Sequence, residues 1–274
     1  MISKASLRLG TIGPIEVSVN VTWLAIFALL VYSLRIGYIA QNAPHLPGYA
    51  AWLVSSLGAV LLFVSVLAHE LSHSLVALKN GLSIRKITLF VFGGVAHMDS
   101  EPRSPGVEFR MAIAGPVASL VIAGLCWLVK SAAVRIGGET VATMVLEYAF
   151  LANLFLACFN LIPGFPLDGG RVMRAILWRL TGNYIRSTVI AATAGRVFAL
   201  FLVFAGVTLA VATGMAMFLW PALVGTFLER LAFLSAQRAK LARRPPAVGR
   251  PIQITTTPLP TYHRDESGFM NDPG

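Results

Sequence analysis

Six long apolar stretches constrain what this chain can fold into more than any other feature. They span residues 21–40, 51–78, 111–129, 144–162, 188–213 and 215–234. A helix needs about 20 apolar residues to cross the hydrocarbon core of a bilayer, and these stretches qualify or nearly qualify. Charged residues make up 12% of the 274 residues, against about 25% in a soluble domain. The sequence therefore predicts an all-α polytopic membrane protein with about six transmembrane helices.

The lysines and arginines are distributed unevenly between the two ends of these stretches. With six spans, Arg35, Lys130 and Arg135 lie on one side, Arg196 lies inside the fifth span, and the other 18 of the 22 basic residues lie on the opposite side. Cytoplasmic loops carry the excess of Lys and Arg, so both termini are predicted to be cytoplasmic. Since the basic residues stand between apolar runs, the net charge of +10 does not indicate a nucleic-acid partner. Arg196 predicts an ion-pair partner or a polar cavity inside the bundle.

Two segments do not resemble simple spans. Residues 83–98 are rich in β-branched and aromatic residues and contain Gly93-Gly94, which predicts a short membrane-associated β region after the second helix. Residues 161–171, LIPGFPLDGGR, contain two prolines and three glycines, so the fourth helix must end or break there. Non-helical backbone at membrane depth is tolerated where it lines a cavity or is buried in protein.

The chain divides into one membrane domain and a tail. Residues 1–236 are predicted to form the transmembrane domain, with a core at about residues 50–180 that contains the motifs described next. Residues 237–274 are rich in proline, begin with basic residues and have little apolar content. That composition is typical of a disordered segment, here a cytoplasmic tail.

The second apolar stretch contains the motif His69-Glu70-Leu71-Ser72-His73. Residues four apart share one face of a helix, so both imidazoles can reach one metal ion, and Glu70 stands next to the first ligand as a general base. Ionisable residues inside a span are costly and are functional by default. The motif therefore predicts a zinc site, since zinc makes a bound water acidic enough to ionise near pH 7.

A catalytic zinc usually has three protein ligands, so a third ligand must come from elsewhere. The motif extension of some soluble proteases is excluded, because Val76 and Lys79 occupy its positions. Asp168 is the best candidate, since the broken fourth span can hold it near the depth of His69. That depth is roughly 14 Å below the cytoplasmic boundary, at 1.5 Å per residue. A plain turn residue in Asp-Gly-Gly remains the alternative for Asp168.

The two motifs together resemble the site-2 protease family of intramembrane zinc metalloproteases. The resemblance rests on residues 69–73 in an apolar helix and on residues 160–169, NLIPGFPLDG, and it covers roughly residues 10–180. It implies one zinc per chain, held by His69, His73 and Asp168, and cleavage of transmembrane proteins near the cytoplasmic side. It also implies regulated intramembrane proteolysis, with a transmembrane protein substrate and a regulatory membrane protein as partners. The compact six-span layout lacks the PDZ or CBS domains of many relatives.

The resemblance also implies roles for four residues outside the ligand set. Asn160 matches an asparagine that positions substrate or stabilises the oxyanion. Phe92, Gly93 and Gly94 match a strand region that pairs with unwound substrate. An ordinary helix-terminal residue is the alternative for Asn160. The stretch Ala114-Gly115-Pro116 also matches the family, and close helix packing with a kink is its preferred interpretation.

Two other function classes compete with an intramembrane endopeptidase of the cell membrane. A metal-ion transporter could use the same ligands for transit, but it would not need Glu70 beside them. A catalytically silent scaffold would be expected to have lost a ligand or the base, and His69, Glu70, His73 and Asp168 are all present.

Overall fold

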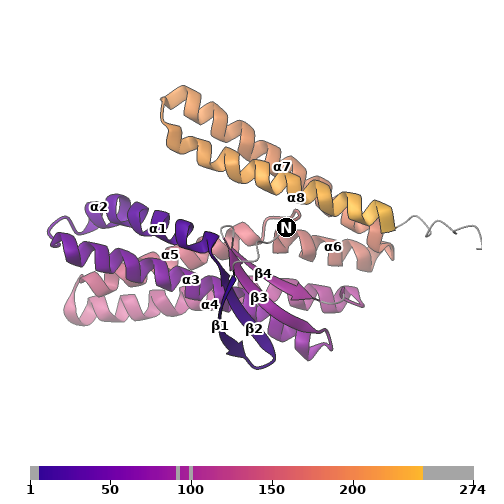
Figure 1. Cartoon of the computed structure of the whole chain (residues 1–274), viewed down its shortest axis with the longest axis horizontal. Coiled ribbons are helices and arrows are strands. Elements are labelled where there is room, and N and C mark those ends of the chain that lie inside the picture. Colours follow the sequence, from indigo (N-terminus) through magenta and orange to yellow (C-terminus); the bar gives the residue numbers. More distant parts are fainter. Residues whose placement is uncertain (1–5, 91–92, 99–100, 243–274) are drawn as a thin grey trace, which may run out of the picture.

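Six long helices dominate the computed structural model, which describes residues 6–90, 93–98 and 101–242 (Figure 1). The first span joins α1 (Thr22–Ser33), a π-helical turn η1 (Leu34–Ile39) and α2 (Ala40–Asn42). The others are α3 (Gly48–Lys79), α4 (Pro105–Gly137), α5 (Val141–Asn160), α7 (Tyr184–Thr213) and α8 (Leu219–Ala242), the last preceded by a 3₁₀ turn η2 (Ala216–Phe218). All six spans are long and apolar enough to cross a bilayer. The prediction of six transmembrane helices is confirmed, and the chain is a multi-pass membrane protein.

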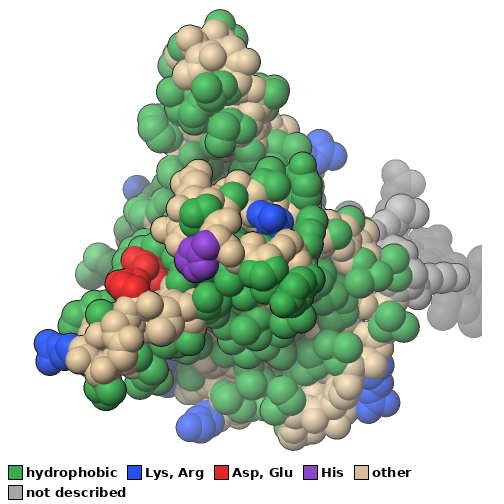
Figure 2. Space-filling model, turned by 90° about the vertical axis from the view of Figure 1, so that its left-hand side faces the viewer, with side chains coloured by type: hydrophobic (Ala, Val, Ile, Leu, Met, Phe, Trp, Pro, Cys, Tyr) green, Lys and Arg blue, Asp and Glu red, His purple; other side chains and the backbone are tan. Residues whose placement is uncertain are grey.

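The outer surface has the character expected in lipid. Hydrophobic side chains cover most of the face in Figure 2, and charged side chains appear there only as isolated spots. Large apolar residues such as Phe155, Phe204 and Val211 are mostly exposed. A soluble protein rarely leaves so much contiguous apolar surface uncovered, whereas lipid tails solvate it.

A four-stranded sheet packs against one end of the bundle. Its order is β1 (Ser6–Ile12), β2 (Ile15–Asn20), β3 (Ile84–Phe90) and β4 (Gly93–Met98), with β2 and β3 parallel and the other pairs antiparallel. The β region predicted after the second helix is confirmed as β3 and β4. The hairpin β1–β2 was not predicted, although Gly13 at φ 57° and Pro14 form its two-residue turn, a recognisable hairpin signal.

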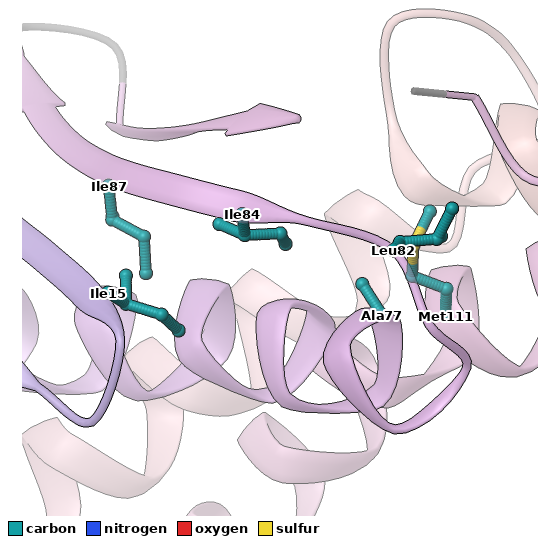
Figure 3. Close-up of a cluster of buried hydrophobic side chains, with 6 residues drawn as sticks. All are labelled: Ile15, Ala77, Leu82, Ile84, Ile87 and Met111. Atoms are coloured by element: carbon teal, nitrogen blue, oxygen red, sulfur yellow. The ribbon is translucent and has the colours of Figure 1, made fainter. Parts of the chain in front are cut away.

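The sheet is fixed to α3 and α4 by a buried apolar cluster. Figure 3 shows its members, which are Ile15, Ala77, Leu82, Ile84, Ile87 and Met111. All are 4% exposed or less. Ala77 lies one turn beyond His73 on α3, so the cluster fixes the sheet next to the predicted metal site.

The break predicted after the fourth span is confirmed. Helix α5 ends at Asn160, residues 161–167 are irregular, and a short helix α6 (Asp168–Thr181) begins at the candidate third ligand. Helix α6 was not predicted. It ends at Gly182, whose left-handed conformation at φ 66° favours glycine.

Helices α7 and α8 form a hairpin that diverges from α1–α4 in Figure 1 and meets the end of α5, where the Phe159 and Phe198 ring centroids lie 6.3 Å apart. The turn between them contains Gly214 at φ 69°. Arg196 on α7 pairs with Glu229 on α8, as predicted for an arginine inside a span. Helix α8 continues to Ala242, so it includes the first six residues of the segment predicted to be a tail, and residues 243–274 lie outside the described part of the chain.

Candidate metal centre

Helix α3 carries both histidines of the motif on one buried face. His69 is 2% exposed and His73 is 6% exposed. Their ring centroids lie 4.9 Å apart, with the ring planes nearly perpendicular. The spacing of four residues therefore brings the two imidazoles together, as the motif predicts.

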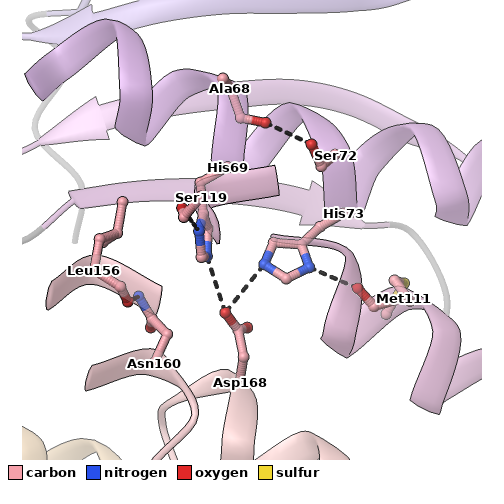
Figure 4. A network of polar contacts seen from close by, with 9 residues as sticks. All are labelled: Ala68, His69, Ser72, His73, Met111, Ser119, Leu156, Asn160 and Asp168. Atoms are coloured by element: carbon pink, nitrogen blue, oxygen red, sulfur yellow. Dashed lines mark hydrogen bonds and ion pairs between the residues drawn. The ribbon is translucent and has the colours of Figure 1, made fainter. Parts of the chain in front are cut away.

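Asp168 meets the two histidines from the first turn of α6 (Figure 4). Its Oδ2 atom lies 3.0 Å from Nε2 of His69 and 3.1 Å from Nε2 of His73. One ligand atom from each of the three residues lies within 4.8 Å of the other two. Ligand atoms around a tetrahedral zinc are about 3.3 Å apart when each lies about 2.05 Å from the metal. The two distances to Asp168 are close to this value, and a donor set of two imidazole nitrogens and one carboxylate oxygen fits zinc in its chemistry.

Residues of helix α4 orient both imidazoles through contacts to their Nδ1 atoms. His73 Nδ1 lies 2.6 Å from the backbone carbonyl oxygen of Met111, and His69 Nδ1 lies 2.9 Å from Ser119 Oγ. A carbonyl can only accept, so Nδ1 of His73 carries the proton and donates it to Met111. The Nε2 lone pair of His73 is then free for a metal, in the arrangement typical of metal-binding histidines.

Gly115 lies midway between those two contacts on α4 and leaves the space in which the ligands meet. A Cβ atom built on Gly115 would lie 2.5 Å from His69 Nε2 and even closer to His73 Nε2. No other residue type leaves the two ligand nitrogens free. Gly115 does allow close helix packing, but the atoms it lets approach are the nitrogens of the metal site.

The general-base candidate, Glu70, faces the sheet. A Cβ atom on Gly94 would lie 3.1 Å from Glu70 Cδ and would overlap with Cγ. Within the part of the chain that the structure describes, strand β4 is the last strand of the sheet and pairs only with β3. The carboxyl-bearing side chain therefore packs directly on the backbone of an edge strand.

The remaining predicted residues are placed less completely. Asn160 ends α5, and its amide donates to the carbonyl of Leu156 at 3.0 Å; Figure 4 draws no bond between Asn160 and the three ligands. Gly93 and Gly94 begin β4, opposite Phe90 and Leu89. Phe92 lies outside the described residues.

Sequence reasoning missed the contribution of α4 to this centre. Met111, Gly115 and Ser119 are four residues apart, so they form one face that matches His69 and His73 on α3. This spacing was one signal, and the other was the resemblance of Ala114-Gly115-Pro116 to the family, for which close helix packing was the preferred interpretation. Any stretch of small residues on a transmembrane helix gives the same signal for ordinary packing.

Comparisons with known proteins agree with this geometry. Residues 57–139 and 132–205 match the family model described as "Peptidase family M50". The chain is 37% identical to "Putative zinc metalloprotease sll0528" of Synechocystis, over 97% of this chain and 69% of that protein. It is 38% identical to "Putative zinc metalloprotease Rip3" of Mycobacterium tuberculosis, over 82% of this chain and 57% of that protein.

A solved structure, "Site-2 Protease from Methanocaldococcus jannaschii", shares the fold with a TM-score of 0.57 and 34% identity. The match covers 84% of this chain and 95% of that one. These matches favour a protease over the metal transporter that the sequence left as an alternative. The chain belongs to peptidase family M50, the site-2 protease family of membrane-embedded zinc metalloproteases.

Proposed function

We propose that this protein is an intramembrane endopeptidase that hydrolyses peptide bonds in or near the transmembrane segments of other membrane proteins. In this proposal one zinc ion is held by His69, His73 and Asp168, and Glu70 is the general base. The observation that carries the proposal is the meeting of three ligand atoms within 4.8 Å at a gap that Gly115 keeps open. An ion-pair network would not need such a gap.

Each residue has a distinct part in the proposed reaction. Zinc, when bound, supplies a Lewis acid that polarises a carbonyl and makes water acidic at neutral pH. Glu70 accepts the proton of the attacking water and returns it to the leaving amine. The Met111 carbonyl and the Ser119 hydroxyl hold the imidazoles in the orientation that directs both Nε2 atoms at the metal.

Substrate binding is proposed at the edge of β4. A transmembrane helix hides its peptide bonds in its own hydrogen bonds, so a substrate must unwind before hydrolysis. An extended segment can recover those bonds by pairing with an exposed strand edge. The edge at Gly93 and Gly94 suits this role because Gly94 contacts Glu70, which brings the paired backbone close to the general base.

Asn160 is proposed to act on the bound substrate, either by positioning it or by donating to the oxyanion. Its support is its place at the end of α5, eight residues before Asp168, the first residue of α6. Its amide donates to Leu156 in this structure, so the proposed role requires the side chain to exchange that bond for one to substrate.

The cellular setting of the proposal follows from charge and family. The excess of basic residues on one side favours a cell-membrane protein with both termini in the cytoplasm. His69 then lies nearer the cytoplasmic end of α3. Members of this family act in regulated intramembrane proteolysis, so we propose a membrane-protein substrate and a separate regulatory membrane protein.

The test separates metal binding from hydrolysis. Glu70→Gln should retain zinc but fail to cleave, so an uncut membrane protein should accumulate in quantitative proteomics of membranes that carry this variant. Glu147→Gln is a suitable control, since Glu147 lies on α5 and pairs with Lys130 at 2.9 Å. Cleavage that persists in the Glu70→Gln membranes would contradict the proposed mechanism.

A further inference from the structure

A second buried charge pair lies beside the metal centre and is not part of the ligand set. Glu108, in the first turns of α4, is completely buried, and Arg174 on α6 is 9% exposed. Arg174 Nε donates to Glu108 Oε1 at 2.7 Å, and Nη2 donates to the same oxygen. The pair joins the helix that carries Asp168 to the helix that orients the histidines.

Two aromatic rings enclose the guanidinium of Arg174. Its central carbon lies 4.8 Å from the ring centroid of Phe165 and 4.7 Å from that of Tyr184. Phe165 belongs to the irregular segment before α6, and Tyr184 begins α7. The Arg174 guanidinium therefore joins three parts of the fold, which are α4, the segment that leads to Asp168, and the start of α7.

The segment before Asp168 is also held tightly by its backbone. Phe165 N donates to the carbonyl of Ala191 on α7 at 3.1 Å. A Cβ atom on Gly164 would lie 2.5 Å from the backbone of Gly195, and one on Gly169 would overlap with the carbonyls of Leu161 and Ile162, just after α5. These contacts fix where the segment crosses α7, but they do not set how α6 is rotated against α4.

The Glu108–Arg174 pair can set that rotation. Glu108 shares a face of α4 with Met111, Gly115 and Ser119, at spacings of three and four residues. The same face of α4 thus contacts both imidazoles through its later residues and α6 through Glu108. A shift of α6 along α4 would break the charge pair and move Asp168 away from His69 and His73.

Stability alone does not explain the pair. Desolvation of two charges offsets much of their attraction, and well-packed apolar residues often serve equally well. What a charge pair adds is direction, because the planar guanidinium fixes its partners at defined angles. That property matters where a ligand must be held to a fraction of an ångström.

We propose that Arg174 and Glu108 are positioning residues that hold Asp168 in place as the third metal ligand. This inference rests on the metal site proposed above. In this proposal the pair contacts neither substrate nor metal. Loss of the pair should therefore change the metal affinity and the geometry of the bound metal.

The test compares two charge pairs of the same chemistry in the full-length protein, purified in detergent. Glu108→Gln/Arg174→Met removes the pair beside the centre. Glu229→Gln/Arg196→Met removes a more exposed pair of the same residue types in the α7–α8 hairpin. There Arg196 Nε lies 2.9 Å from Glu229 Oε1 and the guanidinium lies 5.4 Å from the Phe233 ring. Zinc affinity is measured by competition with a chelator, and coordination by the visible absorption of the cobalt-loaded protein.

We expect the first double variant to bind zinc about 10- to 100-fold more weakly, the usual cost of losing an outer partner of a metal site, with an altered cobalt spectrum. The hairpin variant should stay within about twofold of wild type. Arg174→Lys, which keeps the charge but loses the planar fork, should fall between the two. Unchanged zinc affinity in the first variant, or an equal loss in the hairpin variant, would overturn the proposal.

Two further variants keep the outcome decisive. Asp168→Asn must lose zinc; if it does not, the metal site itself is wrong, and the positioning role fails with it. If the double variant does not fold, Glu108→Asp decides, since it keeps both charges but shortens the side chain, so that the pair can form only if α6 shifts along α4. A folded Glu108→Asp protein with wild-type affinity and cobalt spectrum would then refute the positioning role.

Discussion

Two helix pairs in this protein pack closely through glycine, and only one of them leaves space for a ligand. Between α7 and α8, Cβ atoms on Gly206 and Gly225 would lie 2.7 Å from the backbone of Ala222 and 2.6 Å from the carbonyl of Ala199. Between α3 and α4, a Cβ atom on Gly115 would meet imidazole nitrogens instead. The same residue type thus brings two backbones together in the hairpin and leaves room between the candidate ligands in the core.

The polar atoms around each glycine explain the difference. On α4, the residues one turn before and one turn after Gly115 hold the Nδ1 atoms of His73 and His69. In the hairpin, Gly225 faces the carbonyl of Ala199 and the side chains of Val203 and Leu202. A close contact becomes a site only where the opposite helix supplies ligands and the same helix supplies their outer partners.

The strongest way to break this comparison is Gly115→Ala. The added methyl group would occupy the space between the two Nε2 atoms. Loss of an outer partner of a metal site can weaken zinc binding by about 100-fold, and the effect here should be larger. Proteolysis should fall to background. Helix α4 itself should not suffer, because alanine favours a helix by about 1 kcal/mol over glycine. Metal analysis and thermal unfolding of the purified variant measure the two effects separately.

Gly225→Ala is the matched change in the hairpin. The methyl group would collide with the carbonyl of Ala199, and overpacking of this kind costs about 1–3 kcal/mol. Zinc content should remain that of wild type. A loss of zinc in Gly225→Ala, or full zinc in Gly115→Ala, would remove the distinction between the two helix pairs.

A second glycine contact extends the comparison to the sheet. Gly94→Ala would push against Glu70. In the proposed mechanism this displaces the general base, while the three proposed ligands remain in place. Misplacement of a catalytic group by about 1 Å can cost about 100-fold in rate, so kcat/KM should fall by about 10- to 100-fold with zinc retained. Gly10→Ala on β1 is the control, since a Cβ atom there would meet nothing within 4 Å. Equal activity of the two variants would contradict the placement of Glu70 against β4.

These contrasts also mark what could be predicted from the sequence. The six spans and the pairing of His69 with His73 depend on local patterns, apolar length and a spacing of four, which are visible in any one segment. Gly115 and Gly225 cannot be told apart in this way, because each is a glycine in an apolar helix. What separates them is the opposite helix, which lies far away in the sequence.

The same distinction between local patterns and contacts distant in the sequence applies to the charged residues and to the irregular segment before α6. Arg196 was predicted to have an ion-pair partner or to face a polar cavity, because a charge inside a span needs one or the other. Neither the span nor its charge indicates that the partner is Glu229. Helix α6 escaped prediction because Asp168-Gly169-Gly170 has poor intrinsic helix propensity. It forms where tertiary contacts to α4 and α7 hold it. Asp168 accordingly rested on resemblance before the structure placed it beside the histidines.

A smaller effect on the metal centre should follow Ser119→Ala. Ser119 is fully buried, and its hydroxyl is the partner of His69 Nδ1. Its removal leaves that nitrogen without its outer partner, so zinc affinity should fall by about 10-fold. Ser55→Ala is the matched control, because Ser55 is equally buried on α3 but donates only to the carbonyl of Ala51. If both serine variants bind zinc alike, the face of α4 around Gly115 does not orient His69.

The smallest effect is expected for the charge pair between Glu16 on β2 and Lys86 on β3, which belongs to the sheet and to neither helix pair. Their charged atoms lie 2.9 Å apart and about a third of each side chain is exposed, so Glu16→Gln should leave zinc content and proteolysis unchanged.

The hydrogen bond from Lys86 lowers the pKa of Glu16 below its ordinary value of 4.5. Since the folded state therefore holds this proton less tightly, the pair stabilises the protein above pH 4.5, and that contribution is lost as the pH falls below it. Thermal unfolding of wild type and Glu16→Gln should thus differ slightly at pH 7 and converge at acidic pH. A large loss of activity in Glu16→Gln would mean that the sheet transmits strain to Glu70 through β4. The whole sheet would then count as part of the candidate site.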